Sequence, residues 1–136
     1  MPVLQDTVVA IRSDGDIVAA RQQGRSLAAA IGFTATDATL IATAISELAR
    51  NIVLYAGQGE VMMHSVESSP KKGIVICARD KGPGIRRIED ALRDGYSTSG
   101  GLGLGLPGVK RLMDEFAIES ELGQGTMVTV KKWLNR

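Results

Sequence analysis

Glycine and leucine alternate over Gly101–Gly105, inside a segment with almost no side-chain bulk, residues 95–106. We expect this segment to form a mobile loop. A helix is predicted over 107–116, because apolar residues recur there at helical spacing and Pro107 suits a first helical turn. A glycine loop that leads into a helix presents free backbone N–H groups and the positive end of the helix dipole, which suits a phosphate group. The alternative is a flexible linker before a surface helix.

Two polar residues border the apolar face of a second predicted helix, which Thr36 caps and which runs to about Tyr55. Glu47 and Asn51 are four residues apart, so they stack on one side of that helix. Asparagine is mildly unfavourable within a helix, so its presence in mid-helix indicates a role other than helix formation. An ordinary polar flank is the alternative.

Asp80 directly follows the most strand-like run of the chain, 73–79, at the kind of position where ligands meet open sheets. Gly82 and Gly84 come next, and glycines let the backbone approach a flat ligand closely. The alternative is a tight turn closed by an aspartate. Near the other end of the chain, Gly125-Thr126 lies in the turn of a predicted hairpin.

Further elements must position these residues. We expect a strand over 7–12, a helix over 17–31, a strand over 59–67, and a hairpin formed by 117–121 and 127–133. The only histidine, His64, and the only cysteine, Cys77, both fall in predicted strands and have no metal-binding cluster beside them in sequence. We interpret His64 as structural and Cys77 as a small buried hydrophobe.

The composition limits the class of protein. A chain of 136 residues with 44% hydrophobic residues is expected to form one domain over 1–136 with a real core. A net charge of +1 argues against a general nucleic-acid surface. A single cysteine excludes an internal disulfide framework and suits a reducing compartment. No run is apolar enough for a membrane span or a secretory signal, so we expect a cytoplasmic protein that binds no membrane.

The motifs together form an ordered set along the chain: Glu47-x-x-x-Asn51, Asp80-x-Gly82-x-Gly84, Gly101-x-Gly103-x-Gly105 and Gly123-x-Gly125-Thr126. This set resembles the ATP-binding domain shared by gyrase-type ATPases, a heat-shock chaperone family, histidine kinases and MutL, known as the GHKL superfamily or Bergerat fold. The resemblance covers nearly the whole chain. We therefore expect an α/β (α+β) two-layer sandwich, with a mixed, mostly antiparallel sheet of about five strands and three main helices on one face.

The resemblance also implies roles for individual residues and the cofactors ATP and Mg²⁺. Glu47 would be the general base, Asn51 would ligate Mg²⁺, and Asp80 would accept a hydrogen bond from the adenine amino group. Thr126 would support the adenine contact. The glycines would shape the adenine pocket or belong to a lid over the phosphates: Gly82 and Gly84 for the pocket, and Gly101, Gly103 and Gly105 for the lid. These residue types suit the chemistry, since Mg²⁺ prefers oxygen ligands and phosphoryl transfer mainly needs positioning and charge neutralisation.

Within the superfamily, the compact build resembles the anti-sigma-factor serine kinases of bacterial partner switching, and more closely the switch kinases of bacterial stressosomes. The segments 16–21, 45–51 and 96–116 carry this resemblance. It implies a serine/threonine kinase that phosphorylates STAS-domain scaffold proteins and, once released, activates a downstream output protein. The alternative is a nucleotide-dependent binding module that sequesters a sigma factor. Glu47 favours catalysis because a pure binder needs no base, and a histidine kinase is disfavoured because His64 is the only histidine.

Overall fold

A computed structural model describes residues 7–68, 70–82 and 105–134. The elements follow one another along the chain as β1 (Thr7–Ile11), α1 (Asp14–Ile31), α2 (Ala35–Tyr55), β2 (Gly59–Ser68), β3 (Lys71–Asp80), α4 (Gly105–Leu112), β4 (Glu115–Glu121) and β5 (Gly125–Trp133). Every strand and helix predicted within the described ranges is present. None of the described helices is long and apolar enough to cross a membrane.

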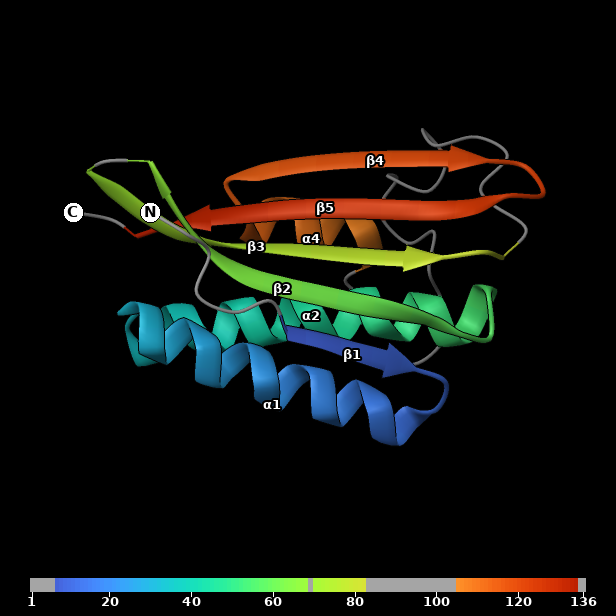
Figure 1. Cartoon of the computed structure of the whole chain (residues 1–136), viewed down its shortest axis with the longest axis horizontal. Coiled ribbons are helices and arrows are strands. Elements are labelled where there is room, and N and C mark those ends of the chain that lie inside the picture. Colours follow the sequence, from blue (N-terminus) through green and yellow to red (C-terminus); the bar gives the residue numbers. More distant parts are fainter. Residues whose placement is uncertain (1–6, 69, 83–104, 135–136) are drawn as a thin grey trace.

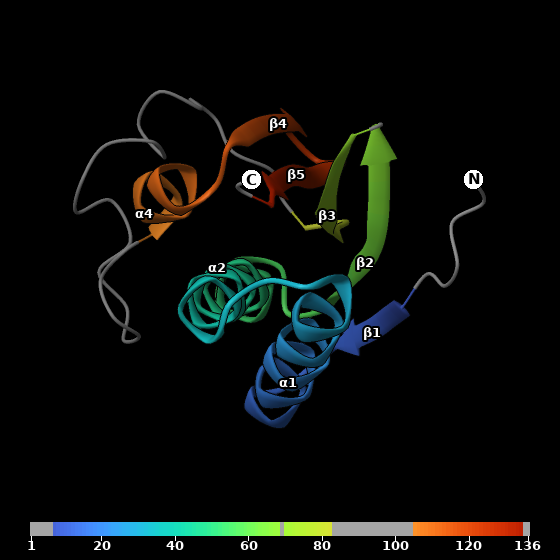
Figure 2. The same ribbon diagram turned by 90° about the vertical axis from the view of Figure 1, so that its left-hand side faces the viewer.

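The strands form one five-stranded sheet in the order β1-β2-β3-β5-β4 (Figure 1). All four pairings between the described strands are antiparallel, so the expected sheet is confirmed but is not mixed in this part of the chain. Figure 2 shows α1, α2 and α4 on the same side of the sheet. The predicted two-layer architecture, with helices on one face, is therefore confirmed.

The core lies between the sheet and the helices. Alternate strand residues face the helices, as the two-residue period of a strand requires. Its fully buried large side chains come from β1, α2, β2, β3, α4 and β5: Ile11, Ile41, Ile45, Leu48, Val61, Met63, Ile74, Ile76, Val109 and Val130. Burying one such side chain contributes roughly 1.5–3 kcal/mol relative to leaving it exposed. Helix α2 packs against α1, α4 and the sheet, so it is the central helix of the layer.

Two helix boundaries differ from the sequence-based expectation. Thr34, not Thr36, caps α2, because its extended backbone lets its hydroxyl accept the Asp37 N–H at 3.1 Å. Helix α4 begins at Gly105 and ends at Leu112, whereas the predicted helix ran from 107 to 116.

The early end of α4 has a physical cause. The Asp114 N–H donates to the Lys131 carbonyl at 2.9 Å, so the chain has already joined the sheet there. The Lys132 ammonium donates to the Leu112 carbonyl at 3.0 Å and satisfies an acceptor that the helix end leaves open. Phe116, with its apolar side chain, then lies in β4 opposite Val130 of β5. The spacing of Phe116 from the apolar residues before it fits a helix, although Phe116 belongs to a strand.

Gly24 permits the close approach of α1 to α2. A Cβ at Gly24 would stand 2.0 Å from Cδ1 of Ile45, which is fully buried. We expect Gly24→Ala to lower the free energy of unfolding by about 1–3 kcal/mol through overpacking, even after alanine's helix-propensity gain of about 1 kcal/mol. Urea unfolding measures this loss.

Ile45→Val provides the matched test, because it removes the methyl group that the new Cβ would meet. Alone it should cost about 0.5–1.5 kcal/mol. The double variant should lose less free energy of unfolding than the two single losses added together. Strict additivity would show that the two helices do not meet at this pair.

Candidate functional site

Asp80 ends the third strand at the centre of the sheet. It pairs with Gly59 of β2 on one side and with Thr126 of β5 on the other. Its side chain shares the helix-facing side with Ala78, two residues earlier. The Asp80 Oδ1 atom accepts the Gly82 N–H at 2.8 Å. This hydrogen bond fixes both the carboxylate and the first residues of the following loop, so the structure brings Asp80, Gly82 and Thr126 together in what we call the Asp80 corner.

Glycines allow three pieces of backbone to close around the Asp80 corner. A Cβ at Gly82 would lie 2.6 Å from the Ala56 Cβ at the end of α2. A Cβ at Gly125 would lie 2.1 Å from the Asp80 carbonyl oxygen, and one at Gly59 would lie 3.0 Å from the Asp80 Cβ. The end of α2 and the two neighbouring strands therefore contact the corner at distances that only glycine permits.

A polar stripe runs along α2 toward the Asp80 corner. Glu47 is 4% exposed and is the only buried polar or charged residue in the described part of the chain. The Oδ1 atom of Asn51 is buried and has no hydrogen-bond partner among the described residues, and the same is true of the Nε atom of Arg50. Residues three and four apart are neighbours on a helix, so Glu47 adjoins both.

Unpartnered polar atoms of this kind are costly and uncommon, and a missing ion or ligand is one explanation for them. An amide oxygen with free lone pairs is a ligand that Mg²⁺ accepts, so Asn51 fits a magnesium site. A guanidinium N–H is a donor and suits an anion. The two atoms thus offer an acceptor and a donor from consecutive residues of one helix.

The spacing along α2 relates this stripe to the Asp80 corner. With a rise of about 1.5 Å per residue, Asn51 lies roughly 8 Å and Glu47 roughly 14 Å before Ala56 along the helix axis. Ala56 itself adjoins Gly82. A ligand with a flat end at Asp80 and an anionic tail along α2 would therefore meet the residues in the order Asp80, Asn51, Glu47.

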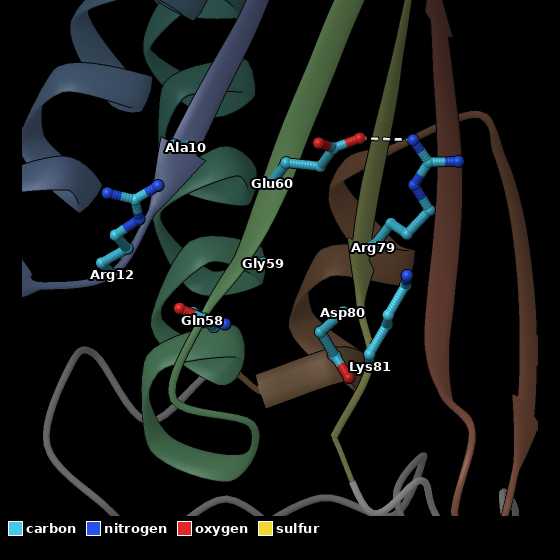
Figure 3. Close-up of a pocket in the computed structure, with 8 residues that line it drawn as sticks. All are labelled: Ala10, Arg12, Gln58, Gly59, Glu60, Arg79, Asp80 and Lys81. Atoms are coloured by element: carbon cyan, nitrogen blue, oxygen red, sulfur yellow. Dashed lines mark hydrogen bonds and ion pairs between the residues drawn. The ribbon is translucent and has the colours of Figure 1, made fainter.

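The strand ends around Asp80 also carry charged side chains on the face of the sheet that no helix covers. A pocket of about 550 Å³ opens there, lined by residues at or next to the ends of β1, β2 and β3 (Figure 3). Arg79 and Glu60 form an ion pair and hydrogen bond across the two strands in this pocket. That hydrogen bond, and then the charge of Glu60, raises the pKa of Arg79. Because successive strand residues alternate faces, Arg79 points away from the face that carries Asp80.

Of the glycines predicted for the lid and for the second position of the adenine pocket, the structure describes only Gly105. Gly105 is buried and is the first residue of α4, with φ +57°, a backbone conformation that favours glycine. Helix α4 packs against α2, on which Glu47 and Asn51 lie. Gly84, Gly101 and Gly103, together with most of the predicted lid at 95–106, lie outside the described residues.

The residues set aside on sequence grounds stay apart from the site. His64 and Cys77 lie on β2 and β3 and face the helix-free side, since each alternates with buried core residues. Cys77 is half-buried, less than expected, and the Thr129 hydroxyl approaches its sulfur at 3.7 Å. Among the described residues, no group of three or more His, Cys, Asp or Glu side chains is placed to hold a metal ion.

Sequence reasoning missed three contributors to the site. The sequence predicts only that Gly59 begins a strand, because its contact with Asp80 depends on strand register. Arg50 has no role in any of the sequence motifs, and only the packing shows that its Nε atom is buried. Ser120 carries no motif at all, yet its Oγ atom lies 2.9 Å from Oγ1 of Thr126.

Comparisons with known proteins agree with this geometry. The sequence profile described as the histidine kinase-like ATPase domain matches residues 12–132. The chain therefore belongs to the histidine kinase-like ATPase domain family. A solved structure of the mycobacterial sensor histidine kinase MprB superposes with a TM-score of 0.51 over 95% of this chain and 96% of that one, at 14% identity, and this likeness supports the fold alone.

Two curated relatives narrow the comparison. The serine/threonine-protein kinase RsbT of Bacillus subtilis is 56% identical over 93% of this chain and 95% of its own length. The anti-sigma F factor of Geobacillus stearothermophilus is 32% identical over 73% of this chain and 71% of its own. These matches confirm the family that the motifs indicated, and the first confirms the resemblance to a serine/threonine kinase.

Gly125 and Gly123 form a matched pair for testing the Asp80 corner. Both have positive φ, +116° and +79°, but a Cβ at Gly123 would meet nothing within 4 Å. Each alanine variant should lose about 1–2 kcal/mol of stability from backbone strain. Gly125→Ala should lose more and should also bind ATP more weakly, because its Cβ would push the Asp80 backbone. Urea unfolding and titration calorimetry measure the two effects, and equal losses in both variants would contradict the close contact.

Proposed function

We propose that this chain is an ATP-dependent protein serine/threonine kinase whose substrate is a hydroxyl of a STAS-domain partner. The observation that carries the proposal is the polar stripe of α2: a buried carboxylate, Glu47, one turn from a buried unpartnered amide oxygen, Asn51. The 56% identity to RsbT supports the acceptor class. The STAS partner, and a downstream output protein activated after release, follow from the resemblance to stressosome kinases.

In the proposed site, the Asp80 corner holds the adenine. The carboxylate accepts a hydrogen bond from the 6-amino group, and Gly59 and Gly82 let the neighbouring strand and the end of α2 pack closely against the corner that holds it. The phosphates run along α2 toward its buried stripe. Asn51 would hold Mg²⁺, which supplies charge neutralisation to the phosphates when bound. The Arg50 guanidinium offers its buried N–H to a phosphate oxygen, where a charged donor is worth more than a neutral one.

Glu47 acts on the acceptor hydroxyl. Its carboxylate takes the proton as the hydroxyl oxygen forms a bond to the γ-phosphorus, and the bond from phosphorus to the bridging oxygen breaks. The products are a phosphoester on the partner and ADP. Glu47 is buried, so little water reaches the carboxylate, and this favours the bound hydroxyl as the nucleophile.

A second function is supported by the anti-sigma F factors among the relatives, which are 28–32% identical to this chain. In that case the protein would act chiefly by nucleotide-dependent binding of a sigma factor. Both functions use the same ATP site, so ATP affinity alone does not separate them. ATP-dependent capture of a sigma factor without transfer to a partner would separate them.

We expect labelled ATP to give acid-stable label on a STAS-domain partner and none on this chain, because a phosphoester survives mild acid whereas a phosphohistidine does not. Glu47→Gln should keep its ATP affinity and lose about 10²–10⁴-fold in transfer rate, the usual contribution of a general base. Glu67→Gln, at an exposed carboxylate on β2, is the control and should transfer normally.

Other outcomes of this experiment decide between the functions. Acid-labile label on His64 would overturn the serine/threonine assignment. ATP-dependent capture of a purified sigma factor without any transfer would favour sequestration. A Glu47→Gln variant that no longer binds ATP would contradict the role of Glu47 as a base.

Neighbouring variants on α2 should separate the metal from the phosphate contact. Asn51→Ala should abolish the increase in ATP affinity that Mg²⁺ produces and leave metal-free binding unchanged. Arg50→Gln should weaken ATP binding about tenfold with or without Mg²⁺, as expected for one lost charged hydrogen bond. Arg25→Gln on the exposed side of α1 is the control. Calorimetry with and without a chelator measures the ATP affinity of each variant in both conditions, and a Mg²⁺ response that survives Asn51→Ala would remove the metal assignment.

A further inference from the structure

A second pocket, of about 850 Å³, lies at the end of the sheet opposite the Asp80 corner. Apolar side chains from the ends of α1 and β5, Ile31 and Leu134, line it together with Trp133, and we call it the Trp133 pocket. Figure 1 shows that β5 ends where β3 begins. Because β3 is ten residues long, Lys71 at its start is roughly 30 Å from Asp80 at its end. The Trp133 pocket is therefore separate from the proposed nucleotide site.

Trp133, the only tryptophan of the chain, is half-buried and held in one position at this pocket. Its indole N–H donates to Oε2 of Glu115 at 2.9 Å, and its backbone N–H donates to Oδ2 of Asp114 at 2.7 Å. A Cβ at Gly73 would lie 2.9 Å from Cε3 of Trp133, so the ring lies directly against the backbone of β3. A large side chain that is already fixed loses little conformational entropy when a partner binds, and tryptophan often contributes strongly to binding energy at interfaces.

Two lysines give the rim of the Trp133 pocket a positive charge. Lys71 and Lys72 are both exposed, and within the described part of the chain neither forms an ion pair with a carboxylate. The two carboxylates that line the pocket, those of Asp114 and Glu115, are instead hydrogen-bonded to Trp133. The Lys71 ammonium lies 5.6 Å from the centre of the Trp133 ring. The pocket thus combines a fixed apolar surface with two positive charges that no carboxylate of the described residues pairs with.

We infer that the Trp133 pocket is a docking site for an acidic segment of a partner protein. The segment would place an apolar side chain against Trp133 and Leu134 and carboxylates beside Lys71 and Lys72. Burial of the apolar side chain supplies affinity, and complementary charge selects the acidic segment.

An anionic membrane surface fits the Trp133 pocket less well. Juxtamembrane segments that bind anionic lipids carry about 4–8 lysines or arginines. The pocket carries two lysines, and two carboxylates that would repel the lipid stand beside them. The inference does not depend on the proposed nucleotide chemistry, and a partner docked here would leave the Asp80 corner open.

A displayed library of random short peptides, selected on the whole protein, tests the inference. The recovered peptides should combine an apolar residue with Asp or Glu, and a synthetic copy should change the fluorescence of Trp133, the only tryptophan. Lys71→Gln and Lys72→Gln should each weaken binding about two- to fivefold, as expected for the loss of an exposed ion pair. Lys81→Gln, at an exposed lysine just beyond the other end of β3, is the matched control and should bind normally.

Charge reversal separates docking from damage to the fold. The double variant Lys71→Glu with Lys72→Glu should lose the acidic peptide and gain binding of the same peptide with lysines in place of its carboxylates, a gain that a damaged fold would not produce. Selection that yields no peptide, or peptides that bind equally well without both lysines, would overturn the inference and leave the proposed kinase function untouched. A change in Trp133 fluorescence with phosphatidylserine vesicles, and none with acidic peptides, would overturn it in favour of a membrane surface.

Discussion

The packing of α2 against the sheet is the constraint on which the rest of the structure depends. This helix has to bury a broad apolar face and still carry Glu47 and Asn51 at the border of that face. A buried carboxylate and an unpaired buried amide oxygen oppose folding, whereas the large apolar side chains of α2 favour it. The fold tolerates the polar stripe because a long, fully packed helix supplies enough burial to hold it in place. A site of this kind needs a central helix and would not persist on a short or peripheral one.

The same packing determines how accurately the two ends of the site are placed. Ala56, at the end of α2, adjoins Gly82, and Asp80 is held between Gly59 and Thr126 in the sheet. Since these contacts involve backbone and Cβ atoms, they leave little freedom to the helix relative to the strand. These main-chain and Cβ contacts, together with the apolar packing of α2, therefore restrict the distance between the Asp80 corner and the polar stripe. Preorganisation of this type lowers the cost of ordering a site when its ligand binds.

Most of the fold was predictable from the sequence because its determinants are local. Apolar periodicity gave the helices and strands, and the ordered motifs gave the architecture through a family resemblance. The end of α4 was not predictable, because Phe116 fits a helical period and only the pairing with Val130 makes it a strand residue. The site divides in the same way. Asp80, Gly82 and Thr126 belong to motifs that sequence can show, whereas the contributions of Gly59, Arg50 and Ser120 arise from strand register and burial, which no single segment encodes.

The alternation of side chains along β3 explains how one scaffold can serve proteins with different partners. Asp80 faces the helices, while its neighbour Arg79 faces the other side and is paired with Glu60 of β2. Residues on the helix-free face can therefore be exchanged without moving the carboxylate. The relatives fit this separation, since a kinase at 56% identity and anti-sigma F factors at 28–32% share one domain. A fold of this kind does not fix a function by itself. Under the proposed function, transfer to a partner would depend on Glu47 as the base, and the choice of partner would depend on surfaces outside the proposed nucleotide site.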